Sequence, residues 1–197
     1  MIARIGELRY QLRVLTILDR DVLLFQLKPV PSGNREKTSL MRKRNVIKYL
    51  SKNREETVKL GERLAHALKG GDIVCLSGDL GSGKTTFTKG IARGLKIKEE
   101  AVNSPTFVLM NAYEGRLPLF HFDLYRLDKE GEILNLGYEE FLYGNGVSVI
   151  EWAEKLGELT PKDFLKIQFE NKSENERLLT LLPLGKRAKE ITGHLKI

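Results

Sequence analysis

The sequence contains few of the residues that support covalent or metal-based frameworks. Cys75 is the only cysteine among 197 residues, so the chain can form neither an internal disulfide nor a cysteine-based metal cluster. This cysteine lies in the apolar run 73–76, where a small buried side chain is expected rather than a reactive thiol. No apolar run has the length of a membrane span, and Asp19 and Asp21 interrupt the apolar stretch near the N-terminus. We therefore expect a cytoplasmic protein with no signal peptide and no membrane partner.

Net charge is also missing from most of the chain. Residues 1–50 carry 11 Lys and Arg against 4 Asp and Glu, whereas residues 51–197 carry 22 of each kind. The overall charge of +7 therefore belongs to the N-terminal segment. A balanced body gives no support for direct nucleic-acid binding by that body.

Residues 1–40 differ from the rest of the chain and are predicted to form an extension. The β-prone runs 14–18 and 22–27 are separated by a charged tripeptide, which predicts a β-hairpin, and the Pro, Ser, Gly and Asn residues of 29–34 predict a linker. An isolated hairpin is only marginally stable in water. Because Met41 begins a stretch typical of the start of a cytosolic chain, we hypothesise that residues 1–40 are dispensable and represent an over-extended gene start.

The central motif is Gly-Asp-Leu-Gly-Ser-Gly-Lys-Thr at 78–85, which matches the phosphate-binding loop G-x-x-x-x-G-K-[ST]. The apolar run 73–76 before it predicts a buried parallel strand, and apolar residues at every fourth position of 87–95 predict a helix after it. In such a loop Lys84 reaches the β- and γ-phosphates and the Thr85 hydroxyl binds Mg²⁺. The loop is therefore predicted to bind a nucleotide.

The remaining pattern predicts an α/β P-loop NTPase fold, with a mostly parallel central sheet flanked by helices and one antiparallel hairpin element. Expected strands are residues 46–50, 73–76, 108–113, 117–123, 147–151, 164–169 and 178–182. A capping box at Asn53 and Glu56 starts a helix that is expected to run to Gly70.

The acidic stretch 127–142 is expected to form short helices broken at Gly131 and Gly137. We assign residues 41–184 to the P-loop ATPase domain and residues 185–197 to a basic, helix-capable C-terminal tail without a predicted position.

Two acids stand at the ends of predicted buried strands. Asp123 ends the run 117–123, and Glu151 ends the run 147–151. P-loop enzymes use a carboxylate at such a strand end to hold Mg²⁺ directly or through water. We therefore predict Asp123, Glu151 and Thr85 as the metal-binding residues.

Two further residues near these acids have two possible roles each. His121 alternates with Asp123 along the strand and would share its face, either orienting water or the acid or serving a structural role. Thr106 follows Ser104 and Pro105, either as part of a switch loop near the γ-phosphate or as a plain turn.

Five motifs together resemble the TsaE (YjeE) family. They are Gly-Asp-Leu-Gly-Ser-Gly-Lys-Thr-Thr-Phe at 78–87, Ser-Pro-Thr-Phe at 104–107, His-Phe-Asp-Leu-Tyr-Arg-Leu at 121–127, Leu-Gly-Tyr-Glu-Glu-Phe at 136–141 and Ile-Glu-Trp at 150–152. The resemblance covers roughly residues 44–182 in unbroken order. It implies a small bacterial P-loop ATPase of tRNA threonylcarbamoyladenosine biosynthesis, with ATP and Mg²⁺ as cofactors.

The same resemblance implies partners and residue roles. The ATPase would associate with the TsaB–TsaD heterodimer, supporting its turnover, and would meet tRNA only indirectly through that complex. Lys84, Asp123 and Glu151 would be the catalytic residues, with Glu151 the Walker-B-like acid. Nucleotide-binding residues would be Asp79, Leu80, Gly81, Ser82, Gly83, Lys84, Thr85, Thr86, Thr106 and Trp152. Arg126 is the internal candidate for an arginine finger, and we expect slow hydrolysis by the protein alone.

Two other classes remain open at this stage. A GTP-binding switch would need guanine readers, and Asn-Lys-Ser-Glu at 171–174 is a near match to N-K-x-D that we interpret as a hairpin turn. A small-molecule kinase would normally need an Arg-rich lid, whereas the stretch 127–146 is acidic. A scaffold that binds nucleotide without hydrolysis also remains compatible with the sequence.

Overall fold

The computed structural model describes the backbone of residues 2–5, 8–18, 22–29, 46–127, 130–134 and 138–195. The chain divides into two compact units, Met1–Arg42 and Lys43–Ile197. The predicted linker beyond Pro29, the start at Met41 and the predicted break at Gly137 lie outside the described residues. Among the described residues, no helix has the length and apolar composition needed to cross a bilayer.

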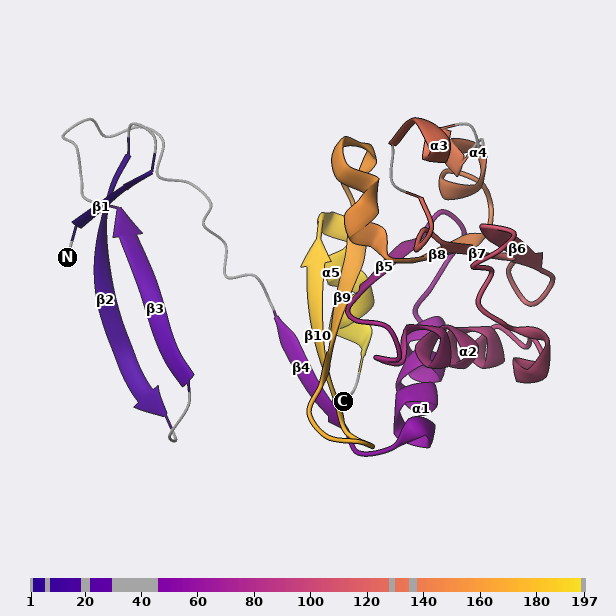
Figure 1. The fold of residues 1–197 in the computed structure, drawn as a ribbon, viewed down its shortest axis with the longest axis horizontal. Helices are drawn as coiled ribbons and strands as arrows, with labels where there is room; N and C mark the ends of the chain where they lie inside the picture. Colours follow the sequence, from indigo (N-terminus) through magenta and orange to yellow (C-terminus); the bar gives the residue numbers. More distant parts are fainter. Residues whose placement is uncertain are drawn as a thin grey trace. The chain divides into compact units, whose positions relative to one another are not determined.

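The first unit is a three-stranded antiparallel sheet in the order β1-β2-β3. Its strands are β1 (Ile2–Ile5), β2 (Leu8–Leu18) and β3 (Val22–Pro29), drawn in indigo in Figure 1. Leu18 pairs with Val22, which confirms the predicted hairpin, and the register shifts between Val14 and Ile17. The additional strand β1 was not predicted, and Pro29 ends β3 instead of belonging to the linker.

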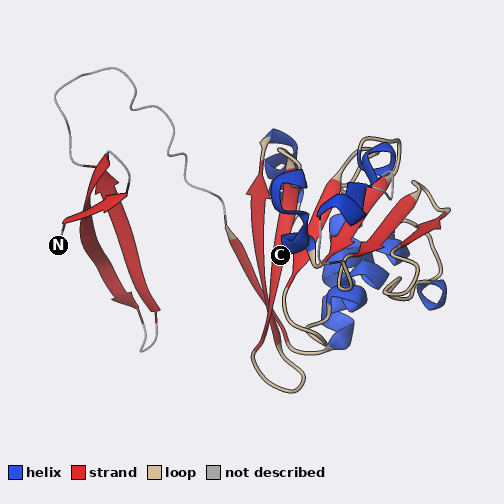
Figure 2. Ribbon diagram, turned by 45° about the horizontal axis from the view of Figure 1, so that its top comes forward, coloured by secondary structure: helices blue, strands red, loops and turns tan. Residues whose placement is uncertain are grey.

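The second unit is built on a seven-stranded sheet in the order β4-β10-β9-β5-β8-β7-β6. Its strands are β4 (Ile47–Ser51), β5 (Ile73–Ser77), β6 (Met110–Tyr113), β7 (Leu119–Asp123), β8 (Val147–Glu151), β9 (Phe164–Asn171) and β10 (Arg177–Leu184). The four central strands β9, β5, β8 and β7 are parallel. Antiparallel strands complete both sides, as Figure 2 shows in red. The predicted fold class is thereby confirmed.

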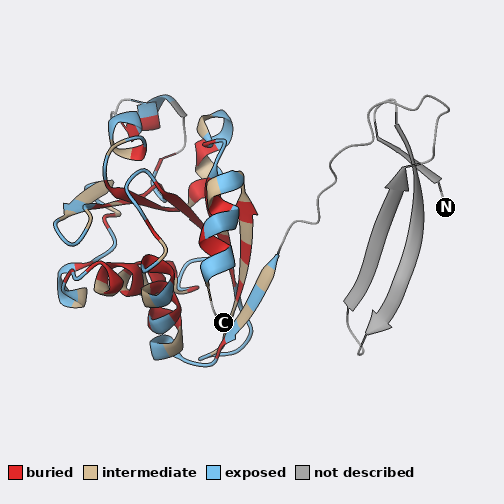
Figure 3. Cartoon of the chain, turned by 180° about the vertical axis from the view of Figure 1, so that it is seen from behind, coloured by how far each residue is buried: buried red, intermediate tan, exposed pale blue. Residues whose placement is uncertain are grey.

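Helices cover both faces of this sheet because the central strands are apolar on both faces. In β5, Val74 and Leu76 face the core shared with α1 (Arg54–Ala65), α2 (Lys84–Gly94) and α5 (Lys186–His194). Ile73 and Cys75 face the second core. That core is covered by α3 (Glu130–Leu134), α4 (Tyr138–Leu142) and the 3₁₀ segment η2 (Ala153–Leu159), and η1 (Glu99–Ala101) follows α2. Figure 3 shows the buried central strands between these layers in red.

Helices α1 and α2 touch backbone to backbone. A Cβ at Gly61 would lie 2.4 Å from the Phe87 carbonyl oxygen, and one at Gly90 would lie 2.1 Å from the Val58 carbonyl oxygen. Both positions therefore require glycine for the close approach. This contact fixes the helix that follows the phosphate-binding loop.

Two helix boundaries differ from the sequence prediction. The Asn53 side chain accepts a hydrogen bond from the Glu56 amide at 2.9 Å, which confirms the predicted start of α1. The helix nevertheless ends at Ala65, because the chain continues to Leu68 through tighter i→i+3 turns that keep the same apolar stripe buried. Gly131 does not break a helix: it lies in the first turn of α3, where its amide needs no helical acceptor.

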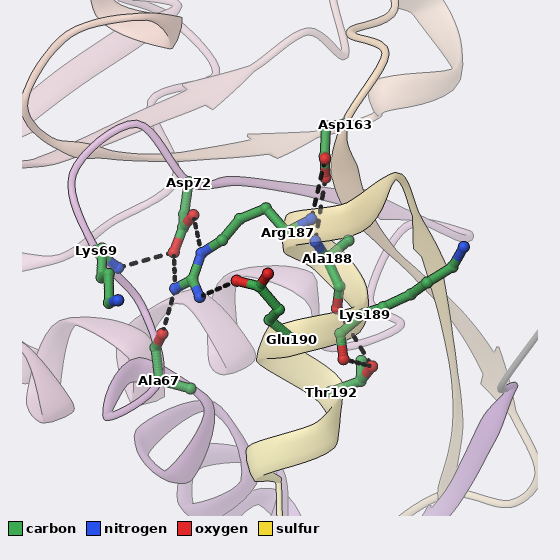
Figure 4. A network of polar contacts seen from close by, with 9 residues as sticks. All are labelled: Ala67, Lys69, Asp72, Asp163, Arg187, Ala188, Lys189, Glu190 and Thr192. Atoms are coloured by element: carbon green, nitrogen blue, oxygen red, sulfur yellow. Dashed lines mark hydrogen bonds and ion pairs between the residues drawn. The ribbon is translucent and has the colours of Figure 1, made fainter.

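The C-terminal segment has a defined place in the second unit. Ala188 and Ile191 of α5 are buried in the main core, so this segment is not an appended tail. Figure 4 shows how α5 is tied down: Arg187 donates two hydrogen bonds of 2.8 Å to the buried Asp72 carboxylate. Asp163 accepts from the amides of Arg187 and Ala188 at 3.0 Å each.

Candidate nucleotide-binding site

The loop at 78–83 joins β5 to α2 and turns through three glycines. Gly78, Gly81 and Gly83 have φ of 136°, 74° and 102°, in the region that side chains rarely adopt. A Cβ at Gly78 would also lie 2.6 Å from the Phe169 carbonyl oxygen. The predicted strand, glycine loop and helix are thus all present in the expected order.

A cavity of about 360 Å³ opens in front of this loop. It is lined by residues 80–86 on one side and by Ser104, Thr106, Asp123, Tyr125, Glu151 and Trp152 on the other. Every predicted nucleotide-binding residue except Asp79 lines it. Asp79 is exposed, and it contributes its backbone carbonyl to Lys84 instead.

Glu151 ends β8 with its carboxylate buried among two hydroxyls and an imidazole. Its Oε2 accepts a hydrogen bond of 2.9 Å from the Thr85 hydroxyl, and its Oε1 accepts one of 3.3 Å from Thr88. His121 Nε2 lies 2.8 Å from Oε1, and its ring is fully buried. The Nδ1 atom of this ring has no hydrogen-bond partner among the described residues.

Asp123 is the register partner of Glu151 on the neighbouring strand β7. Its Oδ2 accepts hydrogen bonds from the hydroxyls of Ser104 and Thr106, the latter at 2.7 Å. Its Oδ1 accepts from the Tyr125 amide at 2.9 Å. The segment that contains Thr106 is therefore anchored to the acid at the end of β7.

Lys84 lies at the cavity wall between these acids and the loop. Its Nζ donates to the carbonyl oxygens of Gly78 at 2.6 Å and Asp79 at 2.8 Å, and it lies 3.9 Å from the centroid of the Trp152 ring. Burial lowers the pKa of the Lys84 ammonium, and the negative charge of Glu151 opposes this shift. Within the described part of the chain, no ion pair joins Lys84 to either acid.

An aromatic pair closes one side of the cavity. Trp152 adopts a left-handed backbone conformation with φ of 59°, and its ring centroid lies 4.9 Å from that of Tyr125. The Arg126 guanidinium lies 5.1 Å from the centroid of the exposed Phe107 ring and does not line the cavity. Arg126 is therefore not placed as an arginine finger in this conformation.

Sequence reasoning did not include Ser104, Thr88 and Tyr125 among the site residues. Ser104 and Tyr125 fall inside the motifs at 104–107 and 121–127, so their positions beside Thr106 and Asp123 were available as a signal. Thr88 follows Thr85 by three positions, which places both hydroxyls on one side of α2.

The donor set in the cavity fits Mg²⁺ bound together with a nucleotide. Among the described residues, no group of three or more His, Cys, Asp or Glu side chains is arranged to hold a metal by itself. The Thr85 hydroxyl and the carboxylates of Asp123 and Glu151 are hard oxygen donors, the type that Mg²⁺ prefers. Because Mg²⁺ commonly takes its remaining ligands from phosphate and water, an incomplete protein set fits this site.

Comparison with known proteins agrees with this geometry. The family model for "Threonylcarbamoyl adenosine biosynthesis protein TsaE" matches residues 51–179. The chain belongs to the TsaE family. This matched range contains the phosphate-binding loop, both strand-end acids and the Ser104–Thr106 segment, so the resemblance stated from the motifs is confirmed.

Individual members of the TsaE family are similar to this chain over most of its length. The TsaE protein of Bacillus subtilis (strain 168) is 43% identical over 142 residues, which cover 72% of this chain and 88% of the relative. The TsaE protein of Treponema pallidum (strain Nichols) is 38% identical over 135 residues, 68% of this chain and 99% of the relative. The crystal structure of Bacillus subtilis YdiB superposes with a TM-score of 0.67 at 36% identity, covering 80% of this chain and 97% of that one.

Proposed function

We propose that this TsaE family protein is a cytoplasmic, Mg²⁺-dependent ATPase that supports the TsaB–TsaD pair in tRNA threonylcarbamoyladenosine biosynthesis. One observation carries the hydrolytic part. Glu151 and Asp123, adjacent in register, face the glycine loop across one cavity, and their described hydrogen-bond partners are hydroxyls, one backbone amide and the His121 imidazole. Among the described residues neither buried carboxylate has a Lys or Arg ion pair, so negative charge remains to be balanced, and a nucleotide-bound Mg²⁺ supplies a cation.

Each residue of the cavity has a definite task in this proposal. The amides of residues 81–85 and the start of α2 bind the phosphates, because the loop presents backbone N–H groups at a helix N-terminus. Lys84 exchanges its two carbonyl partners for phosphate oxygens. Thr85 and Glu151 hold the metal, and Asp123 positions metal or water. When bound, Mg²⁺ neutralises the charge that develops on the transferred phosphoryl group.

We assign His121 a positioning role. Its Nε2 holds one oxygen of Glu151, which leaves the other oxygen directed at Thr85. A buried ring whose Nδ1 has no described partner costs stability, and such a cost is characteristic of functional sites rather than of packing. His121 therefore acts through Glu151 and does not contact the phosphates.

The segment around Thr106 is proposed to respond to the nucleotide. Its hydroxyl shares Asp123 with Ser104, and Phe107 and Val108 beside it are 85% and 64% exposed. A γ-phosphate that competes for the Thr106 hydroxyl would shift these apolar side chains, which gives a partner a surface that depends on nucleotide state.

Adenine rather than guanine is proposed as the base. Residues 171–174 form the start of a hairpin turn between β9 and β10, with Asn171 paired to Arg177, and do not form a free guanine-reading loop. A hollow of about 230 Å³ shares Gly81, Gly83 and Thr86 with the phosphate cavity, and Glu174 and Asn175 of this turn also line it. We place the nucleoside there, so a comparison of ATP with GTP binding tests directly whether this turn reads the base.

The test is phosphate release from ATP by the full chain, alone and with the TsaB–TsaD pair and tRNA. We expect slow release alone and release at least tenfold faster with the pair, because Arg126 is not directed into the cavity. Equal rates with and without the pair would contradict coupling. Equal binding of GTP would contradict the base assignment, and labelled phosphate on a small acceptor would indicate a kinase.

A further inference from the structure

Another polar hollow lies near the amino end of the central strand β5. Its volume is about 330 Å³, and five of its six lining side chains can carry positive charge: Arg63, His66, Lys69, Arg187 and His194, with Ala67 as the sixth. Lys69 precedes the amino end of β5, whereas the glycine loop follows its carboxyl end. The two hollows therefore lie at opposite ends of one strand.

This hollow, which we call the basic hollow, is lined by two separate segments of the chain, residues 63–69 and 187–194. Arg63 is in the last turn of α1 and His66 is its C-cap, Lys69 follows in the connection to β5, and Arg187 and His194 stand at the two ends of α5. No carboxylate is among the side chains that line it. The tertiary fold, not one basic run of sequence, gathers the positive charge.

Only one of the five is held by an ion pair among the described residues. Arg187 pairs with the buried Asp72 and also donates to the Ala67 carbonyl oxygen at 2.6 Å, with a weaker contact to Glu190 at 3.4 Å (Figure 4). The Lys69 backbone amide donates to the same Asp72 at 2.7 Å, so that carboxylate is already satisfied beneath the hollow.

The side chains of Arg63 and Lys69 have no partner among the described residues. Within the described residues, the Arg63 guanidinium and the Lys69 ammonium make no hydrogen bond and no ion pair, and Figure 4 shows the Lys69 ammonium outside the network. Like charges gathered around one hollow repel each other unless an anion joins them. Arg63 stands near the negative end of α1 and His194 near that of α5, which accounts for part of the arrangement, but Lys69 lies in neither helix.

We propose that the basic hollow binds phosphate groups of a polyanion, with Arg63 and Lys69 as the principal contacts. The volume exceeds that of a single phosphate, and several cationic side chains line it, so two neighbouring phosphate groups are the expected occupants. Two sources share this chemistry: the backbone of an RNA strand and a free polyphosphate. The zero net charge of residues 51–197 hides this local concentration.

The experiment uses the full chain and two probes, a fluorescein-labelled single-stranded RNA of eight nucleotides and inorganic pyrophosphate. Anisotropy reports RNA binding, and amide chemical shifts of residues 63–69 report pyrophosphate binding. The test variant is Arg63→Gln with Lys69→Gln. The matched control is Lys48→Gln with Lys98→Gln, which removes the same charge from two exposed lysines outside the hollow.

For RNA as the source, we expect the test variant to bind the oligonucleotide about tenfold more weakly. Its slope of log K against log salt should fall by about 1.4, since each lost phosphate contact removes about 0.7 for a single strand. The control variant should change neither value, and ATP hydrolysis should be unchanged in both. For free polyphosphate, the amide shifts alone should depend on Arg63 and Lys69.

The test and control variants are also compared in a Lys84→Ala background, which removes the cation of the nucleotide cavity. A difference in binding between the two variants that persists in this background belongs to the basic hollow. Equal effects of test and control variants on both probes would overturn the proposal. The two binding measurements contain no ATP, so their failure would leave the ATPase proposal untouched.

Discussion

Buried carboxylates lie near both ends of the central strand β5, and the two ends differ in how the negative charge is balanced. At the amino end, Asp72 is bound by two nitrogens of Arg187 and by the Lys69 amide, so its charge is balanced within the protein. At the carboxyl end, Glu151 and Asp123 accept bonds from hydroxyls, an amide and an imidazole, with no Lys or Arg ion pair among the described residues.

This difference distinguishes a carboxylate that stabilises the fold from carboxylates that are available to a ligand. A buried charge that is paired at once fixes two elements to each other, as Asp72 fixes α5 to the turn before β5. Glu151 and Asp123 have no Lys or Arg ion pair among the described residues, because the neighbouring Lys84 donates to the loop carbonyls instead, so a bound cation can still balance their charge. Variants at the two ends should therefore fail in different ways.

The largest effect is expected at the amino end. Arg187→Gln leaves Asp72 buried without its cation, which should lower the free energy of unfolding by about 3 kcal/mol. Urea unfolding measures this loss. The double variant Asp72→Asn with Arg187→Gln should recover much of it, and ATP hydrolysis per folded molecule should stay unchanged. A single variant as stable as the native chain would contradict the structural role of the pair.

At the carboxyl end, Lys84→Ala should leave stability nearly unchanged while weakening ATP binding at least 100-fold. The reason is the loss of two charge-assisted bonds to phosphate, each worth about 1.5–3 kcal/mol. Fluorescence of Trp152, the only tryptophan and a neighbour of Lys84, measures binding directly. Lys89→Ala in the same helix is the matched control, and it should bind ATP normally.

His121→Asn sharpens the comparison within the site. We expect the Mg²⁺ concentration for half-maximal stabilisation of bound ATP to rise about tenfold, because Glu151 loses a positioning hydrogen bond. ATP affinity measured without Mg²⁺ should stay the same, which a general packing defect would not allow. His121→Gln, whose longer side chain brings its amide donor nearer the position of Nε2, should recover part of the loss.

Cys75 provides a smaller effect on the strand between the two ends. Burial raises the pKa of its thiol to about 12, so at pH 8 only about one molecule in ten thousand carries a thiolate. We expect no reaction with a thiol reagent at pH 8 within an hour, and full reaction in urea. Rapid labelling of the native chain would contradict the buried position.

No effect is the expected result of removing residues 1–40. These residues lie in the separate unit Met1–Arg42, and every residue that lines the nucleotide cavity belongs to the other unit. Size-exclusion chromatography and Trp152 fluorescence should show a folded chain with native ATP affinity. Loss of folding or of nucleotide binding would show that the extension is required.

The sequence predicted the nucleotide end of the sheet better than the opposite end. Strand alternation and parallel order place Asp123 and Glu151 at one edge, so local patterns are enough to bring them to the loop. Arg187 and Asp72 are 115 positions apart, and neither stands in a motif, so their pairing follows only from the packing of α5. The end of α1 was misplaced because an apolar stripe continues through i→i+3 turns as well as through a helix.

The central claim is that Glu151 serves a metal-bound nucleotide, and single-turnover phosphate release from Mg·ATP by Glu151→Gln tests it most directly. The account predicts that release falls at least 100-fold while ATP binding, followed by Trp152 fluorescence, changes less than tenfold. Release at the rate of the native chain would contradict the account and leave a protein that binds nucleotide without using this acid.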